Sequence, residues 1–281
     1  MVAPALPPVQ PLEESYETDV SDAEWEVLRP HLDVRAKTGP LLPVDLRRVF
    51  NALRYKLRTG CQWRLLPKSF PKRSTVSYYF QKWTKSGVLM RINDLLRRRV
   101  RKEVEGRQNV EATGGVIDTQ SVKSTEAGGP ERGFDGGKLV SGRKRNLLVD
   151  TLGLLITAVV HAANTYDGAG ARRVFEVTRQ RGIRLKKVWA DKTFRGSLKV
   201  WMQEQGLGEL EIVERNPGQR GFEVQAKRWV VERTHAWMGR NRQLSKEYDH
   251  SPRSSESWLY LASIRLLTRR LTTSNAARPA P

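Results

Sequence analysis

The sequence of 281 residues has only one cysteine, Cys61, and no long apolar run. One thiol can form neither a disulfide within the chain nor a cysteine-rich zinc site, so a reducing compartment is expected. No uninterrupted apolar stretch reaches the roughly 20 residues that a membrane-spanning helix needs. Residues 1–10 also lack the basic start and the apolar run of a signal peptide. These absences predict a cytoplasmic protein without a membrane partner.

Basic residues are missing from the first 28 positions, which carry seven acids. Over the whole chain the balance is reversed: Lys and Arg number 50 against 30 Asp and Glu, a formal net charge of +20 at pH 7. The excess is concentrated between Arg29 and Lys102, where 20 basic residues stand against three acids. A field of this sign predicts a nucleic-acid-binding region in the first third of the chain. A ribosome-like or simply basic surface is the alternative that composition leaves open.

The pattern of apolar residues divides the chain into two domains and two tails. Residues 1–20 and 272–281 are rich in Pro, Ala, Ser and Thr and have no apolar period, so both are predicted to be disordered. Between them the pattern is helical as far as residue 105 and mixed afterwards. We therefore expect a small helical domain over 21–105 and an α/β domain over 106–271.

Helix signals are frequent in the first domain. Ser21 and Glu24 form a capping box that begins a short helix. Two further helices are predicted to end at Gly60 and Gly87, separated by a connector that contains two prolines, and another helix covers 88–105.

Two helices with a basic and aromatic outer face suit a helix-turn-helix-like DNA reader, whose second helix would lie in the major groove. An ordinary basic helical bundle is the alternative. The candidate DNA contacts in this region are Arg47, Arg48, Arg54, Arg58, Lys72, Arg73, Ser77, Tyr78, Lys82 and Lys85.

Strand and helix signals alternate in the second domain. An apolar strand ends at Asp118, two strands joined by a tight turn follow over 144–161, and another strand ends at Asp191. This order indicates an α/β fold with mixed strand directions. The other predicted elements are helices at 167–180, 197–204, 225–238 and 254–271 and a strand at 210–213.

Three acids of this domain stand where a phosphodiester-cutting site would need them. Such a site binds Mg²⁺ through a few carboxylates, and two ions clamp the attacking and leaving oxygens. Asp118 and Asp191 end strands, where ligands gather in α/β sheets. Glu232 lies in an apolar helix and shares a face with Arg228 and His235. A salt bridge to Arg228 is the structural alternative for this acid.

Other polar residues of the second domain suit structural roles. Asp150 lies in a sequence typical of a hairpin turn, Asp135 lies in a flexible glycine-rich stretch, and His161 ends an apolar strand as packed histidines do. No zinc-protease or paired-cysteine pattern is present, so a catalytic zinc is not expected. Basic residues near the acids are candidates for neutralising DNA phosphates: Lys123, Lys138, Arg143, Lys144, Arg145, Lys192 and Arg195.

Four motifs follow one another along this domain. They read V-I-D-T-Q-S-V-K, F-D-G-G-K-L-V-S-G-R-K-R-N-L-L-V-D, W-A-D-K-T-F-R-G and R-W-V-V-E-R-T-H-A-W. Together they resemble the core of bacterial insertion-sequence transposases of the DDE class, of the type named after insertion sequence five. The text from Asp22 to Arg98 is similar to the small domain that precedes this core. The resemblance covers nearly everything from Ser21 to Leu271.

The resemblance implies an RNase H-like catalytic core in which Asp118, Asp191 and Glu232 are the acidic ligands of two Mg²⁺ ions, which Mn²⁺ can replace. In the family's third-acid motif a Tyr, an Arg and a Lys accompany the Glu. Arg228 matches the Arg, whereas Gln225 replaces the Tyr. Gly239 replaces the Lys, and the candidate substitutes as DNA contacts are Arg240 and Arg242; after Asp191, Thr193 replaces the usual Gly and Phe194 keeps the aromatic.

The resemblance also implies what such a protein does. A transposase binds the terminal inverted repeats of an insertion sequence, cuts the strand with water and joins the freed 3′-OH to target DNA. The partner is double-stranded DNA, and synapsis of two ends requires at least a homodimer. Two alternatives are a non-catalytic DNA-binding protein descended from a transposase and a stand-alone metal-dependent DNA nuclease.

Overall fold

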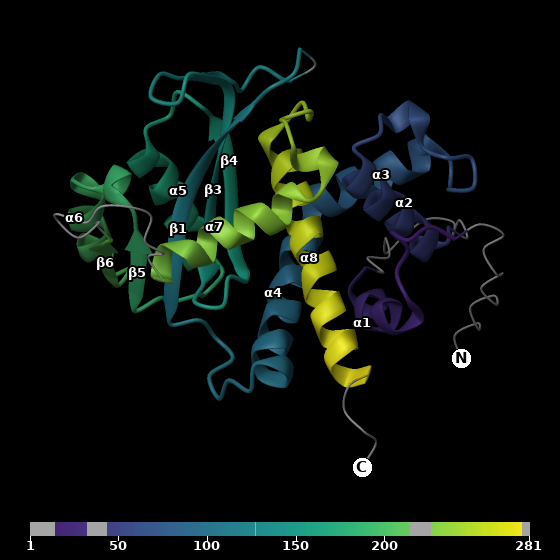
Figure 1. Ribbon diagram of the computed structural model, residues 1–281, viewed down its shortest axis with the longest axis horizontal. Helices are drawn as coiled ribbons and strands as arrows, with labels where there is room; N and C mark the ends of the chain where they lie inside the picture. The colour runs from purple at the N-terminus through teal and green to yellow at the C-terminus, as the bar shows by residue number, and fades with distance from the viewer. Residues whose placement is uncertain (1–14, 33–43, 127, 214–225, 277–281) are drawn as a thin grey trace.

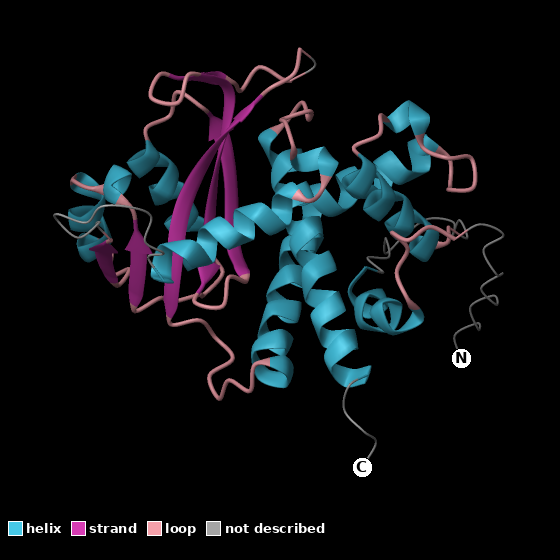
Figure 2. Ribbon diagram, viewed as in Figure 1, coloured by secondary structure: helices cyan, strands magenta, loops and turns pink. Residues whose placement is uncertain are grey.

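The computed structural model describes residues 15–32, 44–126, 128–213 and 226–276 (Figure 1). The helices of the first hundred residues form a helical flank beside a mixed β-sheet (Figure 2). No helix in these ranges is long and apolar enough to span a membrane. The flank consists of α1 (Asp22–Leu32), α2 (Leu46–Thr59), α3 (Arg73–Ser86) and α4 (Val88–Arg99), which a π-helical turn (Val100–Val104) continues.

Capping residues explain where the first helices begin and end. The predicted capping box is present: Glu24 N donates to Ser21 Oγ (3.2 Å), and Ser21 N donates to Glu24 Oε2 (3.1 Å). Asp45 accepts hydrogen bonds from two backbone N–H groups at the start of α2. Gly60 and Gly87 end α2 and α3 with φ of 67°, a left-handed conformation that suits glycine. The predicted ends at these two glycines are confirmed.

The connector between α2 and α3 is longer than the turn of a helix-turn-helix motif. It covers residues 60–72 and includes a 3-10 turn, Trp63–Leu65, whereas the motif uses about three or four residues. Phe70 of the connector is buried and packs on Tyr55 of α2, with ring centroids 5.4 Å apart. The two helices are therefore joined by a packed loop.

The sheet has an antiparallel half and a parallel half. β3 pairs antiparallel with β1 and β4, while β5 and β6 continue from β1 in parallel, giving the order β4-β3-β1-β5-β6. The short β2 pairs with the start of β3. The predicted mixed strand directions are confirmed. The bounds are β1 (Gly114–Lys123), β2 (Gly133–Asp135), β3 (Val140–Asp150), β4 (Leu155–Ala162), β5 (Lys187–Ala190) and β6 (Glu209–Ile212).

Side chains of the strands alternate between two apolar layers. Val116 of β1 packs in the cluster that includes Val231 of α7, whereas Ile117 packs in the cluster formed with α5 and α6. Because side chains two positions apart on a strand share a face, Asp118 points to the side of α7. The helices here are α5 (Asp167–Gln180), α6 (Ser197–Glu204), α7 (Ala226–Gly239) and α8 (Pro252–Ala276).

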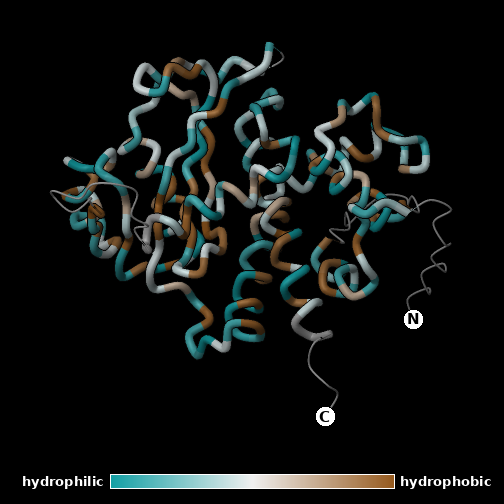
Figure 3. Tube along the Cα trace, viewed as in Figure 1, coloured by the Kyte–Doolittle hydropathy of each residue, from teal (hydrophilic) through white to brown (hydrophobic). Residues whose placement is uncertain are grey.

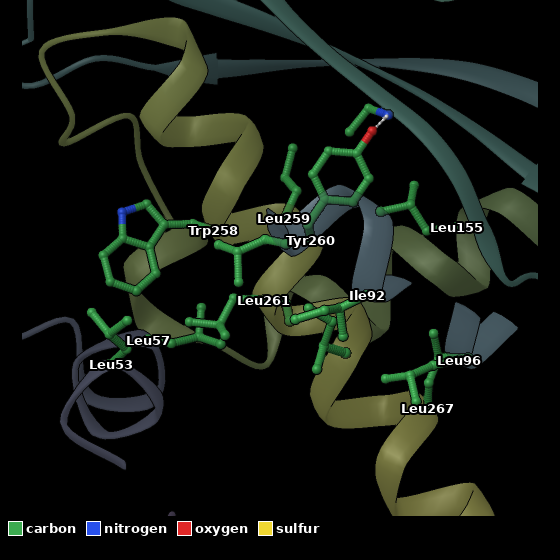
Figure 4. Packing of buried hydrophobic residues seen from close by; sticks show 14 of the residues in the cluster. Leu53, Leu57, Ile92, Leu96, Leu155, Trp258, Leu259, Tyr260, Leu261 and Leu267 are labelled. Atoms are coloured by element: carbon green, nitrogen blue, oxygen red, sulfur yellow. Dashed lines mark hydrogen bonds between the residues drawn. The ribbon is translucent and has the colours of Figure 1, made fainter. Parts of the chain in front are cut away.

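The long helix α8 packs against both the helical flank and the sheet. Trp258 stacks on Phe80 of α3, with ring centroids 4.3 Å apart, and Tyr260 Oη accepts a hydrogen bond from Ala158 N of β4 (3.1 Å). Leucines of α2 and α4 surround the same helix (Figure 4). Hydropathy alternates along α4 and α8, as expected of helices with one buried side (Figure 3). The flank and the sheet therefore share one apolar core.

The predicted boundaries between the two disordered tails and the folded part are wrong. Residues 15–20 are ordered, because Tyr16 packs on the helical flank with a tyrosine ring 4.9 Å away and Val20 is buried. Helix α8 continues to Ala276, beyond its predicted end at Leu271, and the Thr272 hydroxyl in this last part donates to Thr268 O (3.1 Å). The remaining residues of both tails lie outside the described ranges.

Candidate active site

Two of the predicted acids lie at the same level of adjacent strands. β1 and β5 pair in parallel from Gly114 with Lys187 to Val116 with Trp189. Two residues further along this register, Asp191 follows the end of β5 opposite Asp118. Neighbouring strands are about 4.8 Å apart, and alternation directs both side chains to the face that α7 covers. The sheet therefore brings these two carboxylates together.

Helix α7 crosses this face of the sheet in front of β1 (Figure 1). Val231 and Met238 form its buried side. His235 also lies against the sheet, and its Nε2 is 3.3 Å from Asp118 Oδ2. Glu232 stands three residues earlier on the same side of the helix and is exposed. The third predicted acid is thus on the helix that faces the other two.

The three acids have the chemistry to bind a divalent metal, but their side chains do not lie close enough together to hold an ion. Within the described residues, no three His, Cys, Asp or Glu side chains form a group that could hold an ion. The donor set is nevertheless the one that hard cations prefer, since Asp118, Asp191 and Glu232 are carboxylates on rigid elements. Asp118 is 27% exposed, so an ion can reach it from solvent.

The surroundings of Asp118 favour its charged form. Burial by itself raises the pKa of this carboxyl, but the His235 imidazole, the backbone N–H of Thr119 and the charge of Lys138 together hold it below its usual value. Lys138 is fixed beside the strand because its Nζ donates to Thr119 O (3.0 Å). Asp118 is therefore ionised at neutral pH, as a metal ligand must be.

Asp191 is held by Thr193, two residues further along the chain. Its Oδ1 accepts hydrogen bonds from Thr193 N (2.9 Å) and Thr193 Oγ1 (2.5 Å), and it caps the 3-10 turn Lys192–Phe194. Phe194 is fully buried and anchors that turn. The threonine that replaces glycine thus orients the carboxylate.

The prediction that Arg54 of the helical flank contacts DNA is wrong. Its side chain is 3% exposed, and Nη1 lies 2.9 Å from Glu24 Oε2, so the guanidinium is used inside the protein. Arg47 and Arg48 are partly buried: Arg47 pairs with Asp22 (2.6 Å), and Arg48 donates to a backbone carbonyl of the connector. Only the exposed parts of these two arginine side chains are available to contact DNA.

The three basic residues of β3 are also wrong as DNA contacts. Arg145 is 3% exposed and pairs with Glu247 at 2.5 Å. Arg143 has no exposed side-chain surface and donates to three backbone carbonyls. Lys144 is buried and pairs with Asp167 at 2.9 Å. These charges stabilise the loop after α7 and the start of α5, because each has an internal partner.

The remaining predicted contacts with described side chains are exposed or partly exposed. Helix α3 turns Val76, Phe80 and Trp83 inward, which leaves the opposite face to solvent, where Tyr78 is 61% exposed. Gln225 and the side chain of Arg228 lie outside the described residues. The accessible set is Arg58, Lys72, Arg73, Ser77, Tyr78, Lys82, Lys85, Lys123, Lys138, Lys192, Arg195, Arg240 and Arg242.

Two of the three structural assignments made from sequence are confirmed. Asp150 closes the β3–β4 turn, and His161 is buried with its Nε2 2.6 Å from Asn146 Nδ2. The prediction that Asp135 lies in a flexible stretch is wrong, since this residue is buried in β2 and accepts a hydrogen bond from Ser121 Oγ (2.5 Å). Local hydrogen bonds order its glycine-rich turn.

Sequence reasoning missed two features of α7. The contact of His235 with Asp118 was signalled only by the position of this histidine on the face of Glu232. On the opposite side of the helix, the Arg233 guanidinium lies 4.6 Å from the ring centroid of Trp229 and 4.7 Å from that of Trp237. A cavity of about 500 Å³ opens beside this cluster.

Comparison with known proteins gives the family of the chain. Residues 110–267, more than half of the chain, match the family described as "Transposase DDE domain", and residues 20–93 match "Putative transposase of IS4/5 family". Over 115 residues the chain is 26% identical to the "Insertion element IS402 uncharacterized 16.2 kDa protein" of Burkholderia cepacia. That alignment covers 39% of this chain and 76% of the relative. No solved structure shows a significant match.

Proposed function

The chain belongs to the DDE transposases of the IS4/5 type, whose core is RNase H-like, and from this premise we propose that it moves an insertion sequence. It binds the terminal inverted repeats, cleaves the strand at each end and transfers the freed 3′-OH to target DNA. The observation that carries the proposal is the parallel register of β1 and β5, which sets Asp118 opposite Asp191 beneath α7.

Asp118 and Asp191 would hold the metal from the sheet, and Glu232 would complete the set from α7. DDE transposases generally use divalent metals, and two Mg²⁺ ions would neutralise the attacking and leaving oxygens of the phosphodiester. The chain's own residues orient this chemistry: Thr193 fixes the Asp191 carboxylate, and Lys138 lies beside the strand that carries Asp118.

The accessible basic residues outline where DNA would bind. Lys138, Lys192 and Arg195 are exposed on segments next to Asp118 or Asp191, so they would contact the phosphates next to the cut. Lys123 is exposed at the far end of β1 and would contact DNA further from the cut. The outer face of α3, with Tyr78, would read the repeat. Two ends must be held together for transfer, so the active form would be at least a homodimer.

The test is a cleavage assay with a duplex that carries the repeat of the element. Asp118→Asn, Asp191→Asn and Glu232→Gln each remove a metal ligand while keeping the shape of the side chain. Each should abolish Mg²⁺-dependent cleavage and leave the affinity for the duplex nearly unchanged. Glu176→Gln, which changes an exposed acid of α5, is the matched control and should cleave normally.

The products separate this function from its alternatives. Cleavage followed by joining of the 3′-end to a second duplex supports a transposase, whereas cleavage without joining indicates a nuclease. Binding without any metal-dependent nicking indicates a non-catalytic DNA-binding protein. An acid whose variant cuts at the wild-type rate has no part in the site.

A further inference from the structure

The fold brings His235 to Asp118, one of the three acids. The His235 side chain is 10% exposed, and its Nε2 lies 3.3 Å from Asp118 Oδ2. This nitrogen is buried and makes no well-formed hydrogen bond with any described residue. The imidazole therefore faces the Asp118 carboxylate at contact distance, and the same two atoms could bind one ion placed between them.

The distance between these two atoms suits ligands of one ion. With metal–ligand bonds of about 2.1 Å, adjacent ligands of an octahedral ion are about 3.0 Å apart. The separation of Nε2 from Asp118 Oδ2, 3.3 Å, is close to this value. Only a small adjustment of either side chain would therefore let both atoms bind the same ion.

The spacing along α7 supports the same conclusion. Glu232 and His235 form a Glu-x-x-His sequence, in which residues three apart lie on one side of a helix. Carboxylate-bridged metal proteins use this spacing to deliver two ligands from one helix. Val231 and Met238 bury α7 against the sheet, so the helix that carries the pair is held in place.

We propose that His235 is a fourth metal ligand, which binds the ion at Asp118 together with Glu232 and Asp191. The proposal rests on the proposed function, because it extends the same carboxylate site. Imidazole nitrogen is a better ligand for transition metals than for Mg²⁺, which favours oxygen. The site should therefore bind Mn²⁺ more tightly than three carboxylates alone would.

The test uses the full-length protein loaded with Mn²⁺ as the probe. Pulsed electron paramagnetic resonance detects a ¹⁴N nucleus bound directly to Mn²⁺. The wild-type protein should show this signal, and His235→Gln should lose it. His250→Gln is the matched control, because His250 is exposed on the loop after α7, and this variant should keep the signal.

A binding measurement gives a second readout. In titration calorimetry, His235→Gln should weaken Mn²⁺ binding about tenfold or more and change Mg²⁺ binding less. If this variant fails to fold, as judged by circular dichroism, His235→Asn replaces it. A wild-type spectrum without a ¹⁴N signal, or a signal that persists in the folded variant, would overturn the proposal.

Failure of this proposal differs from failure of the proposed function. Cleavage that needs the three acids, with Mn²⁺ showing no nitrogen ligand, rejects His235 as a ligand and leaves the transposase assignment standing. Cleavage that survives in Asp118→Asn rejects the proposed site itself, whatever the spectrum shows.

Discussion

Asp118 and Asp150 lie on neighbouring strands of one sheet but have opposite surroundings. Asp150 has no exposed surface, accepts hydrogen bonds from Leu152 N and Leu154 N (both 2.9 Å), and pairs with Arg101 at 2.7 Å. Asp118 is 27% exposed and faces His235 across 3.3 Å. An acid whose oxygens are satisfied by the backbone and an arginine stabilises the fold, whereas an ionised acid with an open side can bind a metal.

The largest effect expected from this comparison is on catalysis. Asp118→Asn should reduce the single-turnover rate of strand cleavage by about a thousandfold or more, because a metal ligand of the transition state is lost. Asp150→Asn should cleave at nearly the wild-type rate once the rate is corrected for the folded fraction. Equal losses in the two variants would remove the distinction between them.

The second expected effect is on stability. Here the change at Asp150 should have the larger effect and the change at Asp118 the smaller. Asp150→Ala leaves the buried charge of Arg101 without its carboxylate partner and frees two backbone N–H groups, so the free energy of unfolding should fall by about 3–5 kcal/mol. Asp118→Ala should change it by less than about 1 kcal/mol, since the carboxylate is partly solvated. Urea denaturation in EDTA measures both values, and EDTA keeps metal binding out of the comparison.

The sequence was sufficient for features that depend on neighbours along the chain. The capping box at Ser21, the glycines that end α2 and α3, and the turn that Asp150 closes all follow from local rules. The strand ends at Asp118 and Asp191 were predictable because apolar runs stop there. The RNase H-like class came from the order of four motifs.

Features that depend on distant residues were not predictable from local patterns. Arg145 looked like a phosphate contact because nothing nearby in sequence neutralises it; its partner, Glu247, is 102 residues away. Tyr16 lies in an acidic, Pro-rich stretch but packs on a ring of α2. The approach of His235 to Asp118 likewise exists only after α7 crosses the sheet.

A pH experiment extends the comparison to a buried glutamate. Burial raises the pKa of Glu256 to about 7, although a hydrogen bond from Val160 N and the charge of Arg253 oppose the shift. The carboxyl is protonated more readily when folded than when unfolded, where its pKa is 4.5. The contribution of the protonated Glu256 to the free energy of unfolding is therefore complete below the unfolded pKa of 4.5, and it is lost as pH rises through about 7.

Glu256→Gln mimics the protonated form and should remove this dependence. Above pH 8 the variant should exceed the wild type in free energy of unfolding by about 3 kcal/mol, while near pH 4.5 the two should agree. Urea titrations across this range measure the difference. A wild-type protein whose advantage grows with pH would show that Glu256 is ionised and paired with a basic group.

The smallest expected effect is on DNA affinity. It concerns lysines that the fold leaves exposed, in contrast to lysines that it buries and hydrogen-bonds. Lys85 is exposed near the end of α3, whereas Lys56 is buried and donates to Cys61 O (2.7 Å) and Gln243 Oε1 (3.1 Å). Lys85→Ala should weaken binding to the repeat duplex by about 1 kcal/mol and lower the slope of log K against log salt by about one, because one phosphate contact is lost. Lys199→Ala, an exposed lysine on α6, should leave both quantities unchanged. Fluorescence anisotropy at several salt concentrations measures them, and equal slopes for all three proteins would place the DNA away from α3.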